Sequence, residues 1–331
     1  MAIRIVCLSP YPEDVVRGFL RGRYEVLPAI IGEPPAQERI REAVVEADLV
    51  VGDKLHRHRL DRPELGAMRR CRLIQQPAVG FDTIDHAVAA ELGIPVANAA
   101  GYNSVAVGDW TLMAMLNLIR KGHRVDRAMR GGAGGWPQEG AIGRELGSMT
   151  VGIIGLGNAG ARVATRLLGF GSRVLYHDVV ERDAPGLARV NLPELLSGSD
   201  IVSLHTPLEG TTRRLIDADA LARMRPGSFL VNAARGPLVD EAALIAALVS
   251  GHLAGAGLDV FEGEPLAADS PLRGLDNVFL SPHVAGLTRE SEERLVDLTG
   301  DNLLRALEGE TPINVVNGVE VPASRGAART G

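Results

Sequence analysis

Three closely spaced glycines stand between two apolar patterns of different period. Residues 151–154 form a short apolar run typical of a buried strand, and the series Gly155-x-Gly157-x-x-Gly160 follows it and opens a helical pattern. The first glycine permits a tight turn, the second lets a phosphate approach the backbone, and the third lets helix and strand pack closely. The helix N-terminus adds unpaired N–H groups. The pattern predicts dinucleotide binding; a methyltransferase loop is the competing interpretation.

An acidic residue, Asp178, ends the next predicted strand. A carboxylate about 20 residues after such a glycine loop can hold a ribose diol. The same charge repels a 2′-phosphate, so Asp178 favours NAD over NADP. Arg182, four residues later, is a minor argument for NADP, and the plain alternative for this residue is a solvated loop charge.

Three ionisable residues each follow a predicted strand: Arg235, Glu264 and His283. Each alone fits an ordinary loop or junction residue. Together they fit reduction of a 2-keto acid, which needs a cation for the carboxylate, a hydride donor and a proton donor at the carbonyl oxygen. The planar guanidinium of arginine suits a carboxylate. Histidine exchanges protons near neutral pH, and a neighbouring carboxylate favours its charged form and orients the ring.

The elements that must position these residues alternate along most of the chain. Short apolar runs and helical patterns follow one another, which is typical of parallel sheets covered on both faces. Candidate strands are residues 3–8, 49–51, 73–75, 151–154, 174–176, 201–204, 229–231, 255–258 and 278–280, and helical stretches include 36–47, 159–168 and 241–249. Ligands of such sheets gather at the carboxyl edge, where the three ionisable residues are expected.

Two longer helical patterns interrupt the alternation and suggest two domains. Residues 104–129 form one, and a glycine-rich segment follows it, as in a crossover between domains. Residues 288–308 form the other and would return the chain to the first domain. We expect a discontinuous domain of residues 1–101 and 285–331, with 322–331 a disordered tail. The inserted dinucleotide-binding domain would span residues 102–284.

Composition excludes several classes of protein. A length of 331 residues fits two domains, and a net charge of −6 argues against nucleic-acid binding. No apolar run approaches the roughly 20 residues of a membrane span, and the N-terminus is too short an apolar run for a signal peptide. Cys7 and Cys71 lie in apolar runs, which predicts buried thiols in a reducing cytoplasm and no metal site.

Several motifs together resemble the D-isomer-specific 2-hydroxyacid dehydrogenase family over about residues 45–318. In family order they are AVGFDTIDHAVAAELGIPVANAAGYNSVAV (78–107), VSLHTPL (202–208), MRPGSFLVNAARGPLVDEAAL (224–244), AGAGLDVFEGEPL (254–266) and SPHVAGLT (281–288). The resemblance implies an α/β protein, with a Rossmann-type doubly wound parallel sheet inserted into a smaller flavodoxin-like α/β substrate domain. It also implies an NAD-dependent oxidoreductase that transfers hydride between NAD(H) and a small D-2-hydroxy acid or 2-keto acid.

The resemblance assigns roles to the matching residues. Arg235 would bind the substrate carboxylate, Glu264 would pair with the histidine, and His283 would be the general acid–base. Contacts to NAD would come from Gly155, Gly157, Asn158, Ala159, Gly160, Asp178, His205, Thr206, Pro207, Ala233, Asp259 and Gly286. Substrate contacts would come from Val79, Gly80, Arg235, Lys54 and Trp136. For Asp259 a structural hydrogen-bonding role is an equal alternative.

Three features qualify this picture. Trp136 matches a tryptophan that in some relatives reaches the partner subunit's active site, which implies a homodimer. Val107 stands where the family usually has a glutamate, and Gly108 weakens that helix. A strongly basic loop after residues 49–51 is either a solvated cluster or a site for a second anionic group, as in a dicarboxylate, phosphate or phosphonate keto acid; it comprises Lys54, His56, Arg57, His58 and Arg59.

A second class of function stays open beside the enzyme. Corepressor-like regulators that sense NAD(H) share the family's fold and its three ionisable residues. They carry extended tails, which are nearly absent here, so the enzyme is favoured. The remaining histidines are predicted to be loop or surface residues: His56, His58, His86, His123, His177 and His252.

Overall fold

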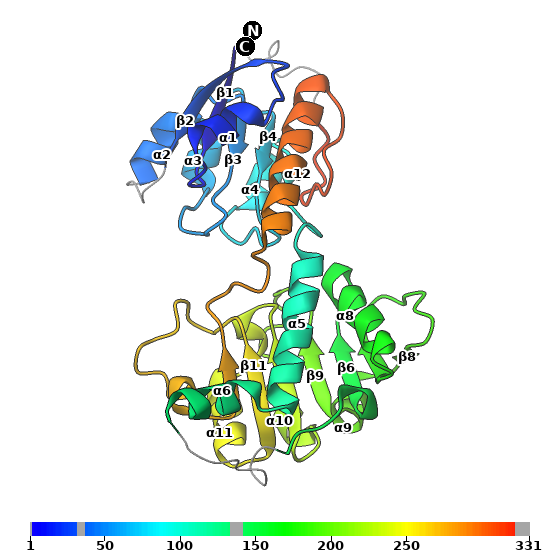
Figure 1. The fold of residues 1–331 in the computed structure, drawn as a ribbon. Coiled ribbons are helices and arrows are strands. Elements are labelled where there is room, and N and C mark those ends of the chain that lie inside the picture. Colours follow the sequence, from blue (N-terminus) through cyan, green and yellow to red (C-terminus); the bar gives the residue numbers. More distant parts are fainter. Residues whose placement is uncertain (1, 32–36, 133–141, 322–331) are drawn as a thin grey trace. The chain divides into compact units, whose positions relative to one another are not determined.

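A computed structural model describes residues 2–31, 37–132 and 142–321. The chain divides into two compact units. Unit 1 comprises Met1–Asn103 and Thr288–Gly331, and unit 2 comprises Ser104–Leu287 (Figure 1). In the described residues no helix has both the length and the apolar character needed to cross a bilayer.

Unit 1 is built on a five-stranded parallel sheet of order β2-β1-β3-β4-β5. Its strands are β1 (Ala2–Cys7), β2 (Glu25–Ile30), β3 (Leu49–Val51), β4 (Leu73–Gln75) and β5 (Val96–Ala97), and its helices are α1 (Glu13–Gly18), α2 (Gln37–Val44), α3 (Arg62–Ala67), α4 (His86–Glu91) and α12 (Arg289–Glu308). Helices α2, α3 and α4 pack on one face, and α1 and α12 pack on the other. This strand order is flavodoxin-like, as the resemblance implied.

Unit 2 is built on a seven-stranded parallel sheet of order β12-β11-β10-β9-β6-β7-β8. Its strands are β6 (Thr150–Ile154), β7 (Arg173–His177), β8 (Ala188–Arg189), β9 (Ile201–Leu204), β10 (Ser228–Asn232), β11 (Leu253–Leu258) and β12 (Val278–Leu280). Its helices are α5 (Ser104–Ile119), α6 (Gly122–Arg130), α8 (Asn158–Gly169), α9 (Leu192–Gly198), α10 (Ala218–Arg223) and α11 (Glu241–Val249). The order reverses between β6 and β9, which is the Rossmann arrangement, so the predicted doubly wound sheet is confirmed.

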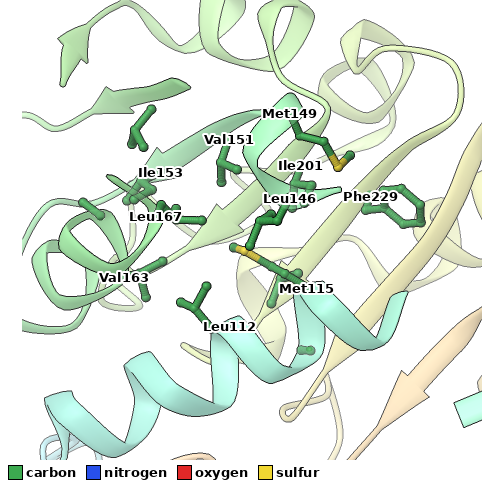
Figure 2. Packing of buried hydrophobic residues seen from close by; sticks show 14 of the residues in the cluster. Leu112, Met115, Leu146, Met149, Val151, Ile153, Val163, Leu167, Ile201 and Phe229 are labelled. Atoms are coloured by element: carbon green, nitrogen blue, oxygen red, sulfur yellow. The ribbon is translucent and has the colours of Figure 1, made fainter. Parts of the chain in front are cut away.

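The core of unit 2 holds helices on both faces of this sheet. Leu112 of α5 and Val163 of α8 pack toward Val151 of β6 in one apolar cluster (Figure 2). A second cluster joins α9, α10 and α11 to the opposite face. The buried faces fix the strand ends, and with them the loops that carry the predicted site.

Two details of the predicted elements were wrong. The helix expected over residues 104–129 is two helices, because Lys121 adopts a left-handed backbone (φ 55°) between α5 and α6. Strand β2 was not predicted, since Pro28 lies in its middle; the strand stands at the sheet edge, where a missing N–H is tolerated. Cys7 and Cys71 are buried, as predicted, and neither forms a disulfide within the described part of the chain.

Candidate active site

The carboxyl edge of unit 2's parallel sheet gathers most of the predicted site residues. Each of five strands is followed directly by at least one predicted site residue. Gly155 follows β6, Asp178 follows β7, His205, Thr206 and Pro207 follow β9, Ala233 follows β10, and Asp259 follows β11; His283 and Gly286 lie on the loop after β12. Since parallel strands end at one edge, these residues share one side of the sheet.

The glycine loop has the geometry of a phosphate cradle. Gly155 has a φ of 89°, and a Cβ there would lie 2.8 Å from the backbone C and O atoms of His205. A Cβ on Gly160 would overlap the carbonyl oxygen of Gly155, whereas a Cβ on Gly157 would meet no atom within 4 Å. The protein's own packing therefore requires Gly155 and Gly160. Gly157 leaves open space before α8, whose first residues are Asn158 and Ala159.

Asp178 is held as a carboxylate beside this loop. Its oxygens accept hydrogen bonds from the backbone N–H groups of Leu156 and Val180, each at 2.8 Å. Burial alone would raise the pKa of Asp178, but these two N–H groups and the nearby guanidinium of Arg182 bring it below its usual value. Arg182 Nε lies 3.7 Å from Asp178 Oδ2, so this arginine is paired with the carboxylate.

His205 is neutral in this environment. Its Nε2 lies 2.9 Å from the hydroxyl oxygen of Ser203, and burial lowers the pKa of His205 to about 4. A neutral imidazole at the strand end can exchange hydrogen bonds, but at neutral pH it is a poor general acid. This fits a place beside the cofactor better than a part in proton transfer.

The side chains of the two residues predicted as an acid–base pair lie in contact. His283 Nδ1 lies 2.7 Å from Glu264 Oε2, and both side chains are partly exposed. The second oxygen of Glu264 accepts a hydrogen bond from Phe261 N at 3.1 Å. Burial opposes ionisation of Glu264, but its hydrogen bond with His283, the N–H of Phe261 and the charge of Arg235 bring its pKa below the usual value. The carboxylate can therefore orient the imidazole and stabilise its charged form.

The loop that carries His283 is fastened by Asp259. The side chain of Asp259 is buried, and it accepts hydrogen bonds from the Ser281 hydroxyl and from the N–H groups of Val284 and Ala285. Its carbonyl accepts the N–H of His283 at 2.7 Å. His283 itself has a left-handed backbone (φ 55°), a conformation that surrounding bonds must hold. This is the structural alternative considered for Asp259; burial raises the pKa of its carboxyl.

Asn232, which ends β10, was missed by the sequence reasoning. Its side-chain amide donates to the carbonyl of Arg235 at 2.9 Å and accepts the N–H of Ala234 at 3.0 Å. Its own carbonyl accepts the N–H of Asp259 at 3.0 Å. Asn232 thus joins the Arg235 loop to the strand end that holds the His283 loop. The available signal was a polar residue closing the otherwise apolar run of residues 229–231.

In unit 1, the predicted substrate residues follow β3 and β4. Val79 and Gly80 lie on the loop after β4, where Asn98 Nδ2 donates to the Val79 carbonyl at 2.7 Å. Lys54 follows β3, and its Nζ lies 2.9 Å from Glu292 Oε2. Trp136 lies outside the described residues, as does the predicted tail of residues 322–331.

The basic loop after β3 is largely neutralised by its neighbours. Arg57 pairs with Asp53 at 3.1 Å, and Arg59 pairs with Asp61 at 3.0 Å. His58 was predicted to be a loop or surface residue; it lies in the loop, but only 3% of its surface is exposed. Burial lowers the pKa of His58, although Asp53 opposes this, so the ring adds no cation at neutral pH.

Comparisons with known proteins agree with this architecture. The sequence model of the D-isomer specific 2-hydroxyacid dehydrogenase NAD-binding domain matches residues 112–285. A glyoxylate reductase of Korarchaeum cryptofilum is 38% identical over 290 residues, covering 86% of this chain and 87% of the relative. An (S)-sulfolactate dehydrogenase of Chromohalobacter salexigens is 42% identical over 257 residues, covering 76% and 82%.

A solved structure shows the same fold with its cofactor. The D-lactate dehydrogenase of Aquifex aeolicus, complexed with NAD and lactic acid, superposes with a TM-score of 0.82 at 30% identity, covering 95% of this chain and 99% of that one. The open space at Gly157 and the carboxylate at Asp178 fit the same cofactor here. From the matched domain, the relatives and the two sheet topologies we conclude that this chain belongs to the D-isomer specific 2-hydroxyacid dehydrogenase family and is an NAD-dependent oxidoreductase acting on CH–OH groups.

Proposed function

We propose that the protein interconverts a small 2-keto acid and the corresponding D-2-hydroxy acid, whose carboxylate is the one anionic group that the site binds. The observation that carries this proposal is the His283–Glu264 pair at 2.7 Å, on the sheet edge that also bears Arg235. Arg235 has no ion pair with a carboxylate among the described residues, in contrast to the arginines of the basic loop. A guanidinium without such a partner is available for a substrate carboxylate.

The residues divide the work of the reduction between them. Bound NADH supplies the hydride that adds to the carbonyl carbon. Arg235 holds the substrate carboxylate through its planar guanidinium and sets the orientation of the keto group. His283, charged, gives its proton to the carbonyl oxygen as negative charge develops there, and Glu264 stabilises the imidazolium until that transfer. In the oxidative direction His283 takes the proton back from the hydroxyl.

The backbone at Val79 and Gly80 would complete the recognition of the carboxylate. Both residues follow a buried strand in an open turn, and the Val79 carbonyl is held by Asn98. Backbone N–H groups of such a turn are suited to carboxylate oxygens, and the resemblance to the family assigns them that role. We propose it for Val79 and Gly80.

The ion pairs of the basic loop favour a substrate without a second anion. The names of the relatives include both kinds, glyoxylate and sulfolactate. Each of Lys54, Arg57 and Arg59 is within ion-pair distance of a carboxylate of this chain. A second anionic group would have to displace one of those carboxylates, which supports glyoxylate-like or pyruvate-like substrates.

We also propose a homodimer that acts in the cytoplasm. Helix α5 is apolar over most of its circumference, and on its outer side Met113 is 43% exposed. Met113 lines a hollow with Phe170, which is 49% exposed, and with the polar side chains of Asp109 and Asn117. We infer that a second copy covers these two exposed apolar side chains, with the polar groups at the rim of the contact. Two buried cysteines, Cys7 and Cys71, form no disulfide among the described residues, which suits a reducing compartment.

Turnover with NADH distinguishes this enzyme from a regulator that only senses NAD(H). The test measures the oxidation of NADH in the presence of glyoxylate, pyruvate and longer 2-keto acids. The loss of NADH absorbance is the readout. Turnover of at least one acid is expected. Tight NADH binding without turnover of any acid would favour the regulator.

The variant Arg235→Ala tests the carboxylate site within that assay. We expect kcat/KM to fall by about 100-fold or more, mainly through KM, because two charge-assisted hydrogen bonds are lost. Arg235→Lys keeps the charge but not the planar fork and should recover only part of the loss. Near-normal KM and kcat in Arg235→Ala would remove Arg235 from the site.

A further inference from the structure

We propose that Glu292 restricts the substrate class by neutralising Lys54, so that 2-keto acids with a second anionic group are disfavoured. The inference rests on the proposed function, because it assumes that the substrate lies along the carboxyl edge of unit 1's sheet. Lys54 and the Val79–Gly80 turn leave that sheet from neighbouring strands, since β3 pairs with β4. A substrate carboxylate bound by the Val79–Gly80 turn would therefore have Lys54 at the neighbouring strand end.

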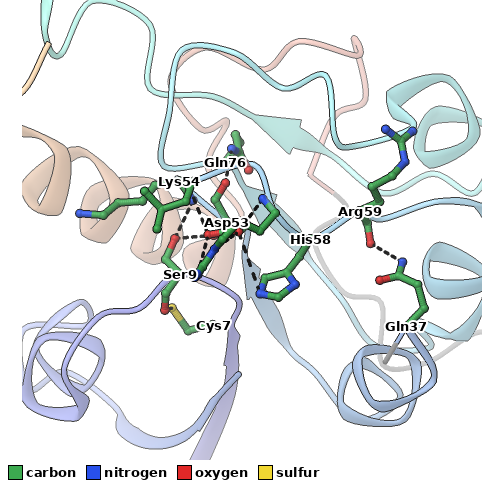
Figure 3. A network of polar contacts seen from close by, with 11 residues as sticks. Cys7, Ser9, Gln37, Asp53, Lys54, His58, Arg59 and Gln76 are labelled. Carbon is green, nitrogen blue, oxygen red and sulfur yellow. Dashed lines mark hydrogen bonds and ion pairs between the residues drawn. The ribbon is translucent and has the colours of Figure 1, made fainter. Parts of the chain in front are cut away.

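The position of Lys54 is fixed by three contacts within unit 1. Its backbone N–H donates to the hydroxyl of Ser9 at 2.9 Å, which anchors the start of the loop. Its Nζ lies 2.9 Å from Glu292 Oε2 and 4.9 Å from the centre of the Tyr11 ring. In Figure 3 the Lys54 side chain extends away from Asp53 and His58. The ammonium therefore belongs to the sheet edge and to α12, not to the acidic partners of its own loop.

Among the described residues, Lys54 is the one ion-pair partner of Glu292. Glu292 lies in the first turn of α12, and its other oxygen, Oε1, is buried without a hydrogen-bond partner among the described residues. The side chains of Lys54 and Glu292 are 24% and 35% exposed. A partly buried ion pair of this kind is screened less than a surface pair, so Lys54 offers little attraction to another anion.

The consequence for a dianionic substrate follows from the same geometry. A second carboxylate or sulfonate near Lys54 would also lie near the Glu292 carboxylate and be repelled by it. With Glu292 replaced by the neutral, isosteric glutamine, the ammonium would lose its counter-ion and keep its place. It would then be free to pair with the distal anion of the substrate.

The other cations of the loop cannot substitute for Lys54. Arg57 and Arg59 pair with Asp53 and Asp61, acids of the same loop, and these pairs do not involve Glu292. Replacement of Glu292 therefore changes the partner of one cation only. This makes the effect of the substitution attributable to Lys54.

The experiment compares kcat/KM for pyruvate with kcat/KM for oxaloacetate and 3-sulfopyruvate, which add a second anion. Wild-type protein should prefer pyruvate. In Glu292→Gln the ratio of dianionic to monoanionic kcat/KM should rise by about tenfold, the size expected for one charge-assisted hydrogen bond. In Glu292→Gln combined with Lys54→Met, that gain should disappear. Glu308→Gln, which breaks the exposed pair of α12 with Arg23, is the matched control and should leave the ratio unchanged.

Several results would overturn the inference. A wild-type preference for either dianionic acid would do so without any variant, and this holds even if Glu292→Gln fails to fold. If the folded Glu292→Gln protein changed kcat/KM by the same factor for every substrate, the ion pair would have only a structural role. Absence of turnover with every 2-keto acid would instead refute the proposed function, so the two failures are distinguishable.

Discussion

Arg235 and His283 stand on loops whose conformations are set by buried side chains of the strand ends. Asn232 bonds both to the Arg235 carbonyl and, through its own carbonyl, to Asp259 N. Asp259 in turn accepts three hydrogen bonds from the loop that carries His283 in a left-handed conformation. The partly exposed reactive groups are therefore positioned by polar groups that are themselves buried, which limits how far their geometry can relax.

The carboxylate of Glu264 should support proton transfer by His283. Its pKa is lowered, so it is ionised throughout the neutral range and can accept a charge-assisted hydrogen bond from the ring. In Glu264→Gln this charged partner is lost, and kcat/KM for keto-acid reduction at neutral pH should fall by about tenfold.

Comparison of kcat/KM for keto-acid reduction in the wild type and in Glu264→Gln provides the measurement. Glu262→Gln is the matched control, since Glu262 lies in the same loop and pairs with Arg214 at 3.3 Å instead of with the histidine. A kcat/KM that is unchanged in Glu264→Gln would mean that the 2.7 Å contact does not govern proton transfer.

At the scale of elements, the turn between β6 and α8 separates glycines needed by the protein from a glycine needed by the cofactor. Gly157→Ala should leave the stability of the cofactor-free protein unchanged, because a Cβ there meets nothing within 4 Å. It should raise the dissociation constant of NADH by about tenfold or more, since the methyl group occupies the space for the pyrophosphate. Gly155→Ala should instead destabilise the fold by about 1–3 kcal/mol, through its φ of 89° and the contact with His205.

Denaturant unfolding of the cofactor-free protein measures the free energy of unfolding of both variants. Fluorescence titration with NADH measures their dissociation constants for the cofactor. Unchanged NADH affinity in Gly157→Ala would show that the phosphates do not pass over this residue. Unchanged stability in Gly155→Ala would show that the left-handed turn can rearrange without cost.

The regular elements were predictable because their apolar periods are local. The strands at residues 49–51, 73–75 and 201–204 have the predicted limits, and α11 begins and ends as expected. The break at Lys121 was not predictable, because a lysine rarely adopts a left-handed backbone and nothing in its neighbours requires it. Strands of two residues, such as β5 and β8, carry no period at all.

The site was predictable only as far as residue types near strand ends could reveal it. Arg235, Glu264 and His283 were predicted because each has a side chain suited to the chemistry and matches a motif of the family. The role of Asn232 depends on bonds to loops whose course the sequence does not specify. The pairing of Lys54 with Glu292 joins residues 238 positions apart, so the sequence alone presented Lys54 as a free cation.

At the scale of the whole molecule, unit 2 exposes apolar surface that its own sheet does not need. Helix α5 contributes Leu112 and Met115 to the core, and Met113 lies on the other side of the same helix in a hollow with Phe170. Helix α6 has no buried residue, yet it carries Val125 and Met129, which are 42% and 68% exposed. Apolar side chains on two successive helices are the kind of surface that self-association covers.

The homodimer proposal predicts that one charge on this surface weakens association without harming the fold. Met113→Asp should raise the dimer dissociation constant by the equivalent of about 2 kcal/mol or more, because an unpaired carboxylate would be buried against the partner. Light scattering coupled to size-exclusion chromatography over a range of concentrations measures it. Val249→Asp, at an exposed apolar position that ends α11 on the opposite face of the sheet, should leave the mass unchanged. A wild-type protein that is monomeric at micromolar concentration would exclude the dimer. A Met113→Asp dimer that is as tight as the wild-type dimer would place the contact on another surface.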